Sequence, residues 1–207
     1  MQAEELLKDI YKTYSRLSSY EDNGVVSQTL TDGSGMVTIS FKTLFKRPNL
    51  YYCHFDCSMP SPFQSMVTRI SVGSDGKEAF LYERDQDFQS VIKRGTLSDM
   101  LTLVTAVSAG AATQVASLLM PEEVGDIGLN KLVNVIINKD DLMTNKEYYT
   151  ISGAYPRGAH IRLKVSTLSS LIIETTEIFR NSIDLTCRKD IKINQHIPDT
   201  IFSLPKH

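Results

Sequence analysis

The chain has 207 residues, of which 42% are hydrophobic and 22% are charged, and its formal net charge is −2 at pH 7. This composition is that of an ordinary globular domain and not that of a disordered chain. Because Lys and Arg are scattered, no basic surface for a phosphate backbone is expected, so nucleic acid is not a predicted partner. The length suits one domain, residues 1–207.

No apolar run reaches the about 18 residues that a membrane-spanning helix needs, since the longest weakly polar stretch, Leu97–Met120, contains Ser, Thr, Gly and Gln. The first residues, MQAEELLKDI, lack the basic and apolar regions of a secretory signal. The sequence therefore leaves two alternatives, a cytosolic protein or an exported one whose leader has been removed.

The first half of the chain is predicted to be one helix followed by a meander of strands. Apolar residues recur at helical spacing from Leu6 to Leu17, with Glu and Lys on the other side. Period-two alternation and turn-forming residues such as Asp75-Gly76 then predict strands near residues 25–30, 37–45, 51–57, 66–72, 79–82 and 88–92.

The pattern changes to helical in the middle of the chain. Residues 96–120 predict two helices, with Thr96 or Ser98 as the cap of the first and Gly110 as a break, and Pro121–Glu123 suits the first turn of another. Four or five strands follow, near residues 149–153, 161–165, 171–179 and 183–193. The predicted fold class is α+β: a curved antiparallel sheet of about ten to eleven strands with a helical insertion at about 96–129.

No arrangement of residues predicts catalysis or a metal centre. The four histidines fall in separate segments without metal-ligand spacing, and no nucleophile elbow or phosphate-binding loop is present. His54 and Asp56 share one strand face and could form an acid/base pair, but this face is polar, so solvated side chains are the simpler interpretation. A nucleophilic Cys53 is disfavoured because the side chain of His54 points to the opposite face. No cofactor is expected.

Three cysteines are too few for a disulfide scaffold. Cys53 and Cys57 lie on one predicted strand, roughly 13 Å apart by the strand rise, too far for a bond. Either Cys187 pairs with one of them or all three are small buried residues.

The predicted strands present much aromatic and aliphatic surface on one face, with only short helices to cover it. A strongly curved sheet must fill its concave face with side chains, a helical plug or a ligand. The sequence thus leaves two alternatives, an apolar cavity or a plain packed core.

Two turn motifs and a tail, in order along the chain, carry a family resemblance. The segments F-K-T-L-F-K-R-P-N-L (Phe41–Leu50), V-G-S-D-G-K-E-A-F-L-Y (Val72–Tyr82) and Ile197–Phe202 resemble the LolA-like periplasmic carriers of outer-membrane lipoproteins. The resemblance implies an unclosed β-barrel capped by an N-terminal helix and a helical lid, acyl chains bound inside, and export. By position in the motif, Arg47 is the residue implied to latch the lid through its backbone, the alternative being an arginine that stabilises the turn.

This resemblance yields a non-enzymatic carrier as the first functional hypothesis. Its partners are lipid or lipoprotein acyl chains and a membrane-bound donor or acceptor protein, and the carrier is expected to be a monomer. Two alternatives are a sensor or protein-interaction domain with a self-filled core, and a small hydrolase, for which the sequence offers no nucleophile beside a base. The residues expected to line the acyl site are Phe41, Phe45, Tyr51, Phe55, Met66, Ile70, Phe80, Leu101, Val104, Leu163 and Ile173.

Overall fold

A computed structural model describes residues 3–33, 35–59, 66–85, 88–93, 95–124, 128–138, 147–156 and 158–204. It contains an N-terminal helix, six strands, a group of short helices, five further strands and a final 3₁₀ turn. The elements are α1 (Ala3–Ser15), β1 (Ser19–Leu30), β2 (Met36–Lys46), β3 (Leu50–Met59), β4 (Met66–Asp75), β5 (Ala79–Arg84), β6 (Gln89–Ile92), α2 (Leu97–Val104), α3 (Ala111–Gln114), α4 (Ala116–Leu119), α5 (Pro121–Val124), η1 (Leu129–Lys131), β7 (Val133–Ile137), β8 (Tyr148–Ala154), β9 (His160–Ser166), β10 (Ile172–Ile178), β11 (Ser182–Ile193) and η2 (Asp199–Phe202).

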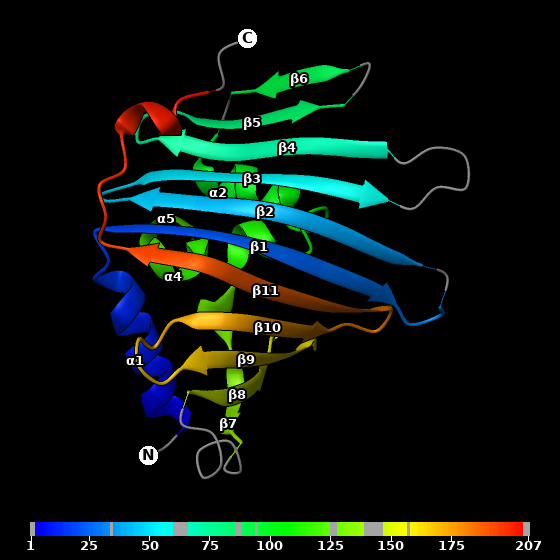
Figure 1. The fold of residues 1–207 in the computed structure, drawn as a ribbon, viewed down its shortest axis with the longest axis vertical. Coiled ribbons are helices and arrows are strands. Elements are labelled where there is room, and N and C mark those ends of the chain that lie inside the picture. Colours follow the sequence, from blue (N-terminus) through cyan, green and yellow to red (C-terminus); the bar gives the residue numbers. More distant parts are fainter. Residues whose placement is uncertain are drawn as a thin grey trace.

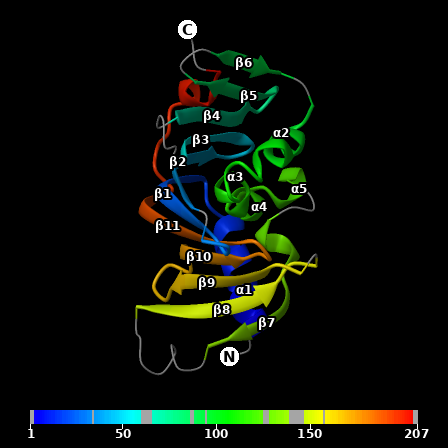
Figure 2. The same ribbon diagram turned by 90° about the vertical axis from the view of Figure 1, so that its right-hand side faces the viewer.

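All eleven strands form one antiparallel sheet in the order β6-β5-β4-β3-β2-β1-β11-β10-β9-β8-β7. Two meanders meet at the centre, where the long strands β1 and β11 pair over most of their length. The outermost strands β6 and β7 do not meet, so the barrel is unclosed, and the helices lie on one face of the curved sheet (Figures 1 and 2). The predicted α+β fold class is confirmed.

The helix α1 forms because its apolar residues return every third or fourth position. One side of the helix buries Leu6, Leu7, Ile10 and Tyr14. Acidic residues occupy the first turn, where the positive end of the helix dipole stabilises their negative charge. The hydroxyl of Tyr14 accepts a hydrogen bond from the backbone N–H of Ile172 at 3.1 Å. This bond ties α1 to the start of β10, at the sheet half opposite β3 and β4.

We call residues 97–124, which hold the helices α2 to α5, the lid. Thr96 caps α2 in a capping box with Asp99. Gly110, with a φ of 79°, lies directly before α3 and breaks the helical path between α2 and α3. Both features were predicted, although Ser98 is not the cap: its hydroxyl instead donates to the carbonyl of Val124 at 3.3 Å. The lid contains four short helices where the sequence predicted two and a further short one.

The strand predictions hold with shifted ends, and two differences concern length and number. The first strand starts at Ser19, six residues before the predicted Val25, because α1 ends early and the chain enters the sheet at once. The strand β7 (Val133–Ile137) was not located from the sequence, since it is an edge strand whose pairing with β8 shifts register between Val133 and Ile136. Such a bulge removes the alternation on which strand prediction rests.

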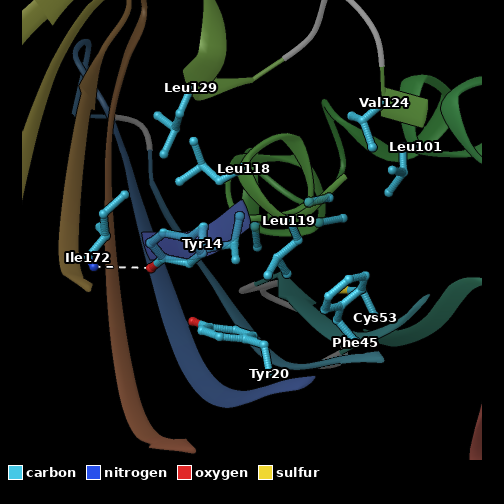
Figure 3. Packing of buried hydrophobic residues seen from close by; sticks show 14 of the residues in the cluster. Tyr14, Tyr20, Phe45, Cys53, Leu101, Leu118, Leu119, Val124, Leu129 and Ile172 are labelled. Carbon is cyan, nitrogen blue, oxygen red and sulfur yellow. Dashed lines mark hydrogen bonds between the residues drawn. The ribbon is translucent and has the colours of Figure 1, made fainter. Parts of the chain in front are cut away.

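The core lies between the concave face of the sheet, α1 and the lid (Figure 3). Leu101, Leu119 and Leu129 from the helical side are fully buried together with Tyr14 and Phe45. A small second cluster on the outer face holds Leu44, Ile197 and Phe202, so the C-terminal tail packs behind the sheet. In the described part of the chain, no helix is long and apolar enough to span a membrane.

Candidate functional site

The concave face under the lid is apolar along β2, β3 and β4. Cross-strand register places these side chains in rows: Phe41 faces Phe55, which faces Ile70. The lid seals this face with Leu101 and Val104 from α2, which contacts β4 and β5. The members of the buried cluster that were predicted to line the acyl site are Phe41, Phe45, Tyr51, Phe55, Ile70, Leu101, Val104 and Leu163.

Two predicted lining residues lie elsewhere. Phe80 pairs with Gly73, and its ring lies 6.4 Å from the ring of Tyr52 on the outer face of the sheet. The prediction for Phe80 was wrong because residues 79–82 are apolar on both faces of the strand, so the alternation could not show which face is buried. Ile173 is half-buried at a bulge, and its neighbour Ile172 is the buried member of the core. Met66 pairs with Met59, and its side chain lies outside the described residues.

Arg47 follows β2 and reaches the helices through four backbone carbonyls. Its Nε donates to Leu17 O at 2.9 Å, and its Nη2 contacts Ser15 O at 2.7 Å, Tyr14 O at 3.4 Å and Leu119 O at 3.1 Å. Three of these oxygens lie at the end of α1, where a cation is favoured by the helix dipole. The fourth belongs to α4, so the predicted contact between Arg47 and the lid backbone is present.

The centre of the concave face is polar, in contrast to its β2–β4 half. Arg188 and Asp22 form a hydrogen-bonded ion pair at 2.5 Å, with both side chains fully buried. Asp22 also accepts from the hydroxyl of Tyr20 at 2.8 Å, and Arg188 donates to Oε1 of Gln114 in the lid at 3.1 Å. The guanidinium further lies 5.1 Å from the ring centre of Phe41. The lid is thereby bound to the sheet by a charged side chain in a water-poor setting.

A pocket of about 520 Å³ opens beside this network, between the lid and the ends of β1, β10 and β11. Its rim includes the exposed side chains of Thr102, Ala106 and Phe179. Deeper residues include Gln114, which is fully buried. The residues that line the pocket are Gln28, Thr102, Thr105, Ala106, Ala109, Gly110, Thr113, Gln114, Gly128, Tyr155, Glu177, Phe179, Ser182 and Asp184.

Two carboxylates in the pocket wall have altered acidity. Burial raises the pKa of Glu177 to about 7, although the hydroxyl of Tyr155, which donates to it at 2.8 Å, acts in the other direction. Burial also raises the pKa of Asp184, which accepts from Gln28 Nε2 at 3.0 Å. The pocket thus carries acidic groups whose charge is poorly solvated.

No protein-family model matches the chain, and no match was found among curated proteins. Similar solved structures exist at 10–12% identity. LprF from Mycobacterium bovis aligns over 95% of this chain and 94% of its own, with 10% identity and a TM-score of 0.51. The chain therefore shares the fold of LprF, an open antiparallel sheet with helices on its concave face.

Two further solved structures align with this chain over nearly their whole length. A DUF1329 family protein from Desulfovibrio piger aligns over 97% of this chain and 95% of its own, with 10% identity and a TM-score of 0.47. The LolA superfamily protein NE2245 from Nitrosomonas europaea aligns over 99% and 98%, with 12% identity and a TM-score of 0.42.

On the outer face of the sheet, His54 lies between the side chains of Ser71 and Asp56. His54 Nδ1 is 2.9 Å from Ser71 Oγ, and His54 Nε2 is 3.4 Å from Asp56. A nucleophile must reach its substrate, yet Ser71 is 2% exposed and its oxygen also contacts the hydroxyl of Tyr52 at 3.1 Å. This network therefore has the form of a structural hydrogen-bond chain.

The cysteines are free thiols. Cys53 and Cys57 face the interior, whereas Cys187 pairs with Glu174 on the outer side of the sheet, so the alternative of a bond to Cys187 is wrong. Burial raises the pKa of the Cys53 thiol to about 12, which disfavours a nucleophilic thiolate. Among the described residues, no group of three or more His, Cys, Asp and Glu side chains could hold a metal ion.

The buried polar residues on the concave face were not predicted from the sequence. The available sign was an alternation in β11, where Asp184, Thr186 and Arg188 share one face and Ile183 and Leu185 share the other. That pattern would have placed the charged face toward water. Only the pairing with β1 shows that the charged face is the buried one.

Proposed function

We propose that this domain is a non-enzymatic, exported carrier that binds acyl chains of a lipid or lipoprotein between the apolar half of its sheet and the lid. The observation that carries this proposal is the cover on that half: in the described part of the chain, the apolar surface of β2, β3 and β4 is closed by the short helices of the lid. Helices of four to eight residues are not stable alone, so their position depends on packing.

The contacts of the lid are unequal along its length. Tyr51 donates to Ala112 O at 2.7 Å and Arg47 donates to Leu119 O, so directional bonds hold α3 and α4. Among the described residues, the side-chain hydrogen bonds of α2, in contrast, stay within the lid, as in the bond from Thr102 to Ser98 O. Apolar contacts are non-directional and can be replaced by an acyl chain. We infer that the chain enters by displacing α2.

The energy of such an exchange is sufficient. Burial of one CH₂ contributes about 0.8 kcal/mol, so a C16 chain supplies on the order of 10 kcal/mol before the costs of ordering. Part of this free energy is needed to expose Leu101 and Val104 again, which are buried in the closed form. The remainder is compatible with reversible transfer to a membrane-bound donor or acceptor.

The experiment uses wild-type protein purified without detergent, Leu101→Ala, and Leu103→Ala as the matched control, because Leu103 is 57% exposed on the same helix. A pyrene-labelled phospholipid in phosphatidylcholine vesicles reports transfer to acceptor vesicles, and native mass spectrometry reports the bound species. Leu101→Ala weakens the closed form, so we expect faster transfer or tighter binding than in Leu103→Ala. An apo mass and no transfer in all three proteins would refute the carrier.

A second candidate function is a sensor or protein-interaction domain with a self-filled core. The complete burial of Leu101 and Leu119 favours it, since a core of this kind needs no guest. The same experiment separates the two functions. A self-filled core binds no lipid even when Leu101 is shortened, whereas a displaceable lid responds to that change.

A further inference from the structure

Two carboxylates face each other across strands β10 and β11 in the pocket wall. Glu177 and Asp184 are direct partners in the register, and they are 4% and 2% exposed. Like charges at directly opposite positions destabilise a sheet, and burial adds to this effect. The buried cation of the region, Arg188, is already bound to Asp22 and Gln114. Among the residues that the structure describes, the pair is therefore left without a cation of its own, which lowers the stability of the fold.

Gln114 provides a second and independent feature. Its Oε1 accepts from Arg188, which fixes the orientation of the amide, and the side chain is 1% exposed in the pocket wall. Nε2 finds no acceptor at hydrogen-bonding geometry among the described residues, although it lies near enough to Glu177 to favour the charged carboxylate. A buried donor without an acceptor points to an oxygen that a ligand would supply.

Gly110 keeps the space between these groups open. A Cβ atom on this residue would lie 3.1 Å from Gln114 Nε2 and 3.3 Å from Glu177 Oε2, and the backbone φ of 79° also favours glycine. The donor of the amide and the acceptor of the carboxylate thus border one gap. A group that carries both an N–H and an oxygen would match it.

The charge of the lining selects among ligands. Among the described residues, the lining holds two carboxylates and no Lys, Arg or His, so both carboxylates would repel a phosphate or a carboxylate. An ammonium would form charge-assisted hydrogen bonds with Glu177 and Asp184. We propose that this pocket binds the polar end of an amphiphile that bears a primary ammonium beside a carbonyl or hydroxyl oxygen.

This inference rests on the proposed function, because the acyl chain of such an amphiphile would lie in the adjoining apolar region. Ala109 connects the two regions, since it lines the pocket and belongs to the buried apolar cluster. The chain and the polar end make separate contributions to binding. The two proposals can therefore be tested separately in one set of ligands.

The experiment measures calorimetric affinities of decylamine, decanol and decanoate below their micelle concentrations at pH 8. For the wild type, we expect decylamine to bind about tenfold more tightly than decanol, with decanoate the weakest, because a charge-assisted bond is stronger than a neutral one. In the double variant Glu177→Gln with Asp184→Asn, the ratio of decylamine to decanol affinity falls to about one, while decanol binds as before.

Glu174→Gln serves as the matched control, because Glu174 lies on the same strand and pairs with Lys164 on the outer face. It should keep the tenfold ratio. The unchanged affinity of the double variant for decanol shows that this variant is folded. A ratio near one in the wild type, or a ratio that survives in the double variant, overturns the inference and leaves the carrier intact. Absence of binding by all three ligands overturns the carrier itself.

Discussion

The strands β3 and β11 belong to one sheet but follow opposite rules. In β3 the apolar side chains of Tyr51, Cys53 and Phe55 point to the interior, as alternation predicts. In β11 the interior side is polar, with Asp184 and Arg188 buried, whereas Ile183 and Leu185 are 43% and 37% exposed on the outside. The concave face therefore has an apolar half, on which α2 packs through exchangeable apolar contacts, and a polar half, where Arg188 holds the lid by a directional bond to Gln114.

This difference assigns separate tasks to the two halves. Apolar contacts lose little specificity when one hydrocarbon replaces another, so the β3 half suits a guest of variable shape. Buried polar groups are costly to leave unpaired, so the β11 half holds the lid in one position and discriminates between polar ends. The following changes test that division.

The largest effect is expected for Asp22→Ala. This change leaves the fully buried guanidinium of Arg188 without its carboxylate, which should lower the free energy of unfolding by about 3–5 kcal/mol. Urea unfolding followed by circular dichroism measures it. The double variant Asp22→Ala with Arg188→Met removes the uncompensated charge and should recover part of the loss. If the double variant is as unstable as the single one, the ion pair is not the cause.

A pH-dependent effect is expected for Glu177→Gln. The pKa of Glu177 is raised from its ordinary value of 4.5 to about 7 in the folded protein, so between these values the folded state binds more protons than the unfolded one. Stability contributed by this residue is therefore lost as the pH rises through this window, by on the order of 3 kcal/mol in total.

Glu177→Gln removes that loss, so the variant should be more stable than the wild type at pH 8 and similar to it at pH 4. Thermal unfolding across this range provides the measurement. Glu174→Gln, the same substitution at a partly exposed position on the outer face of the same strand, serves as the matched control. If the slope in Glu177→Gln equals that of the wild type, water solvates the Glu177 carboxylate in the folded wild type.

The buried polar residues Asp22 and Glu177 also mark the limit of what the sequence predicts. The fold class, the helical insertion and the break at Gly110 follow from local patterns, whereas the contact of Arg47 with the lid is what the family resemblance of the K-R-P motif implied. The polar half follows from neither, because alternation shows that two faces differ but not which one is buried. The face of β11 is set by its pairing with β1, a contact between residues more than 150 positions apart.

A smaller effect is expected where the two halves meet, at Gly24. An added Cβ would lie 2.2 Å from Phe41 Cζ and 2.6 Å from Cys187 O, so the ring that covers this glycine must move. Gly24→Ala should cost about 1–3 kcal/mol, as overpacked cores do, and Phe41→Leu in the same chain should restore part of it. Gly35→Ala, where no atom lies within 4 Å, is the control for urea unfolding. Equal stabilities of the two alanine variants would contradict this account.

The smallest change in global stability is expected for Arg47→Lys, and its location is the informative result. Lysine keeps the charge at the end of α1 but lacks the fork that reaches both Ser15 O and Leu119 O, so about 1 kcal/mol should be lost. If Arg47 latches the lid, amide hydrogen exchange should accelerate about fivefold in residues 111–119 and stay unchanged in β3. If Arg47 only stabilises its turn and the end of α1, acceleration would be confined to residues 3–18. The bond to Leu119 favours the first outcome, because it is the contact of Arg47 that crosses from the sheet to the lid.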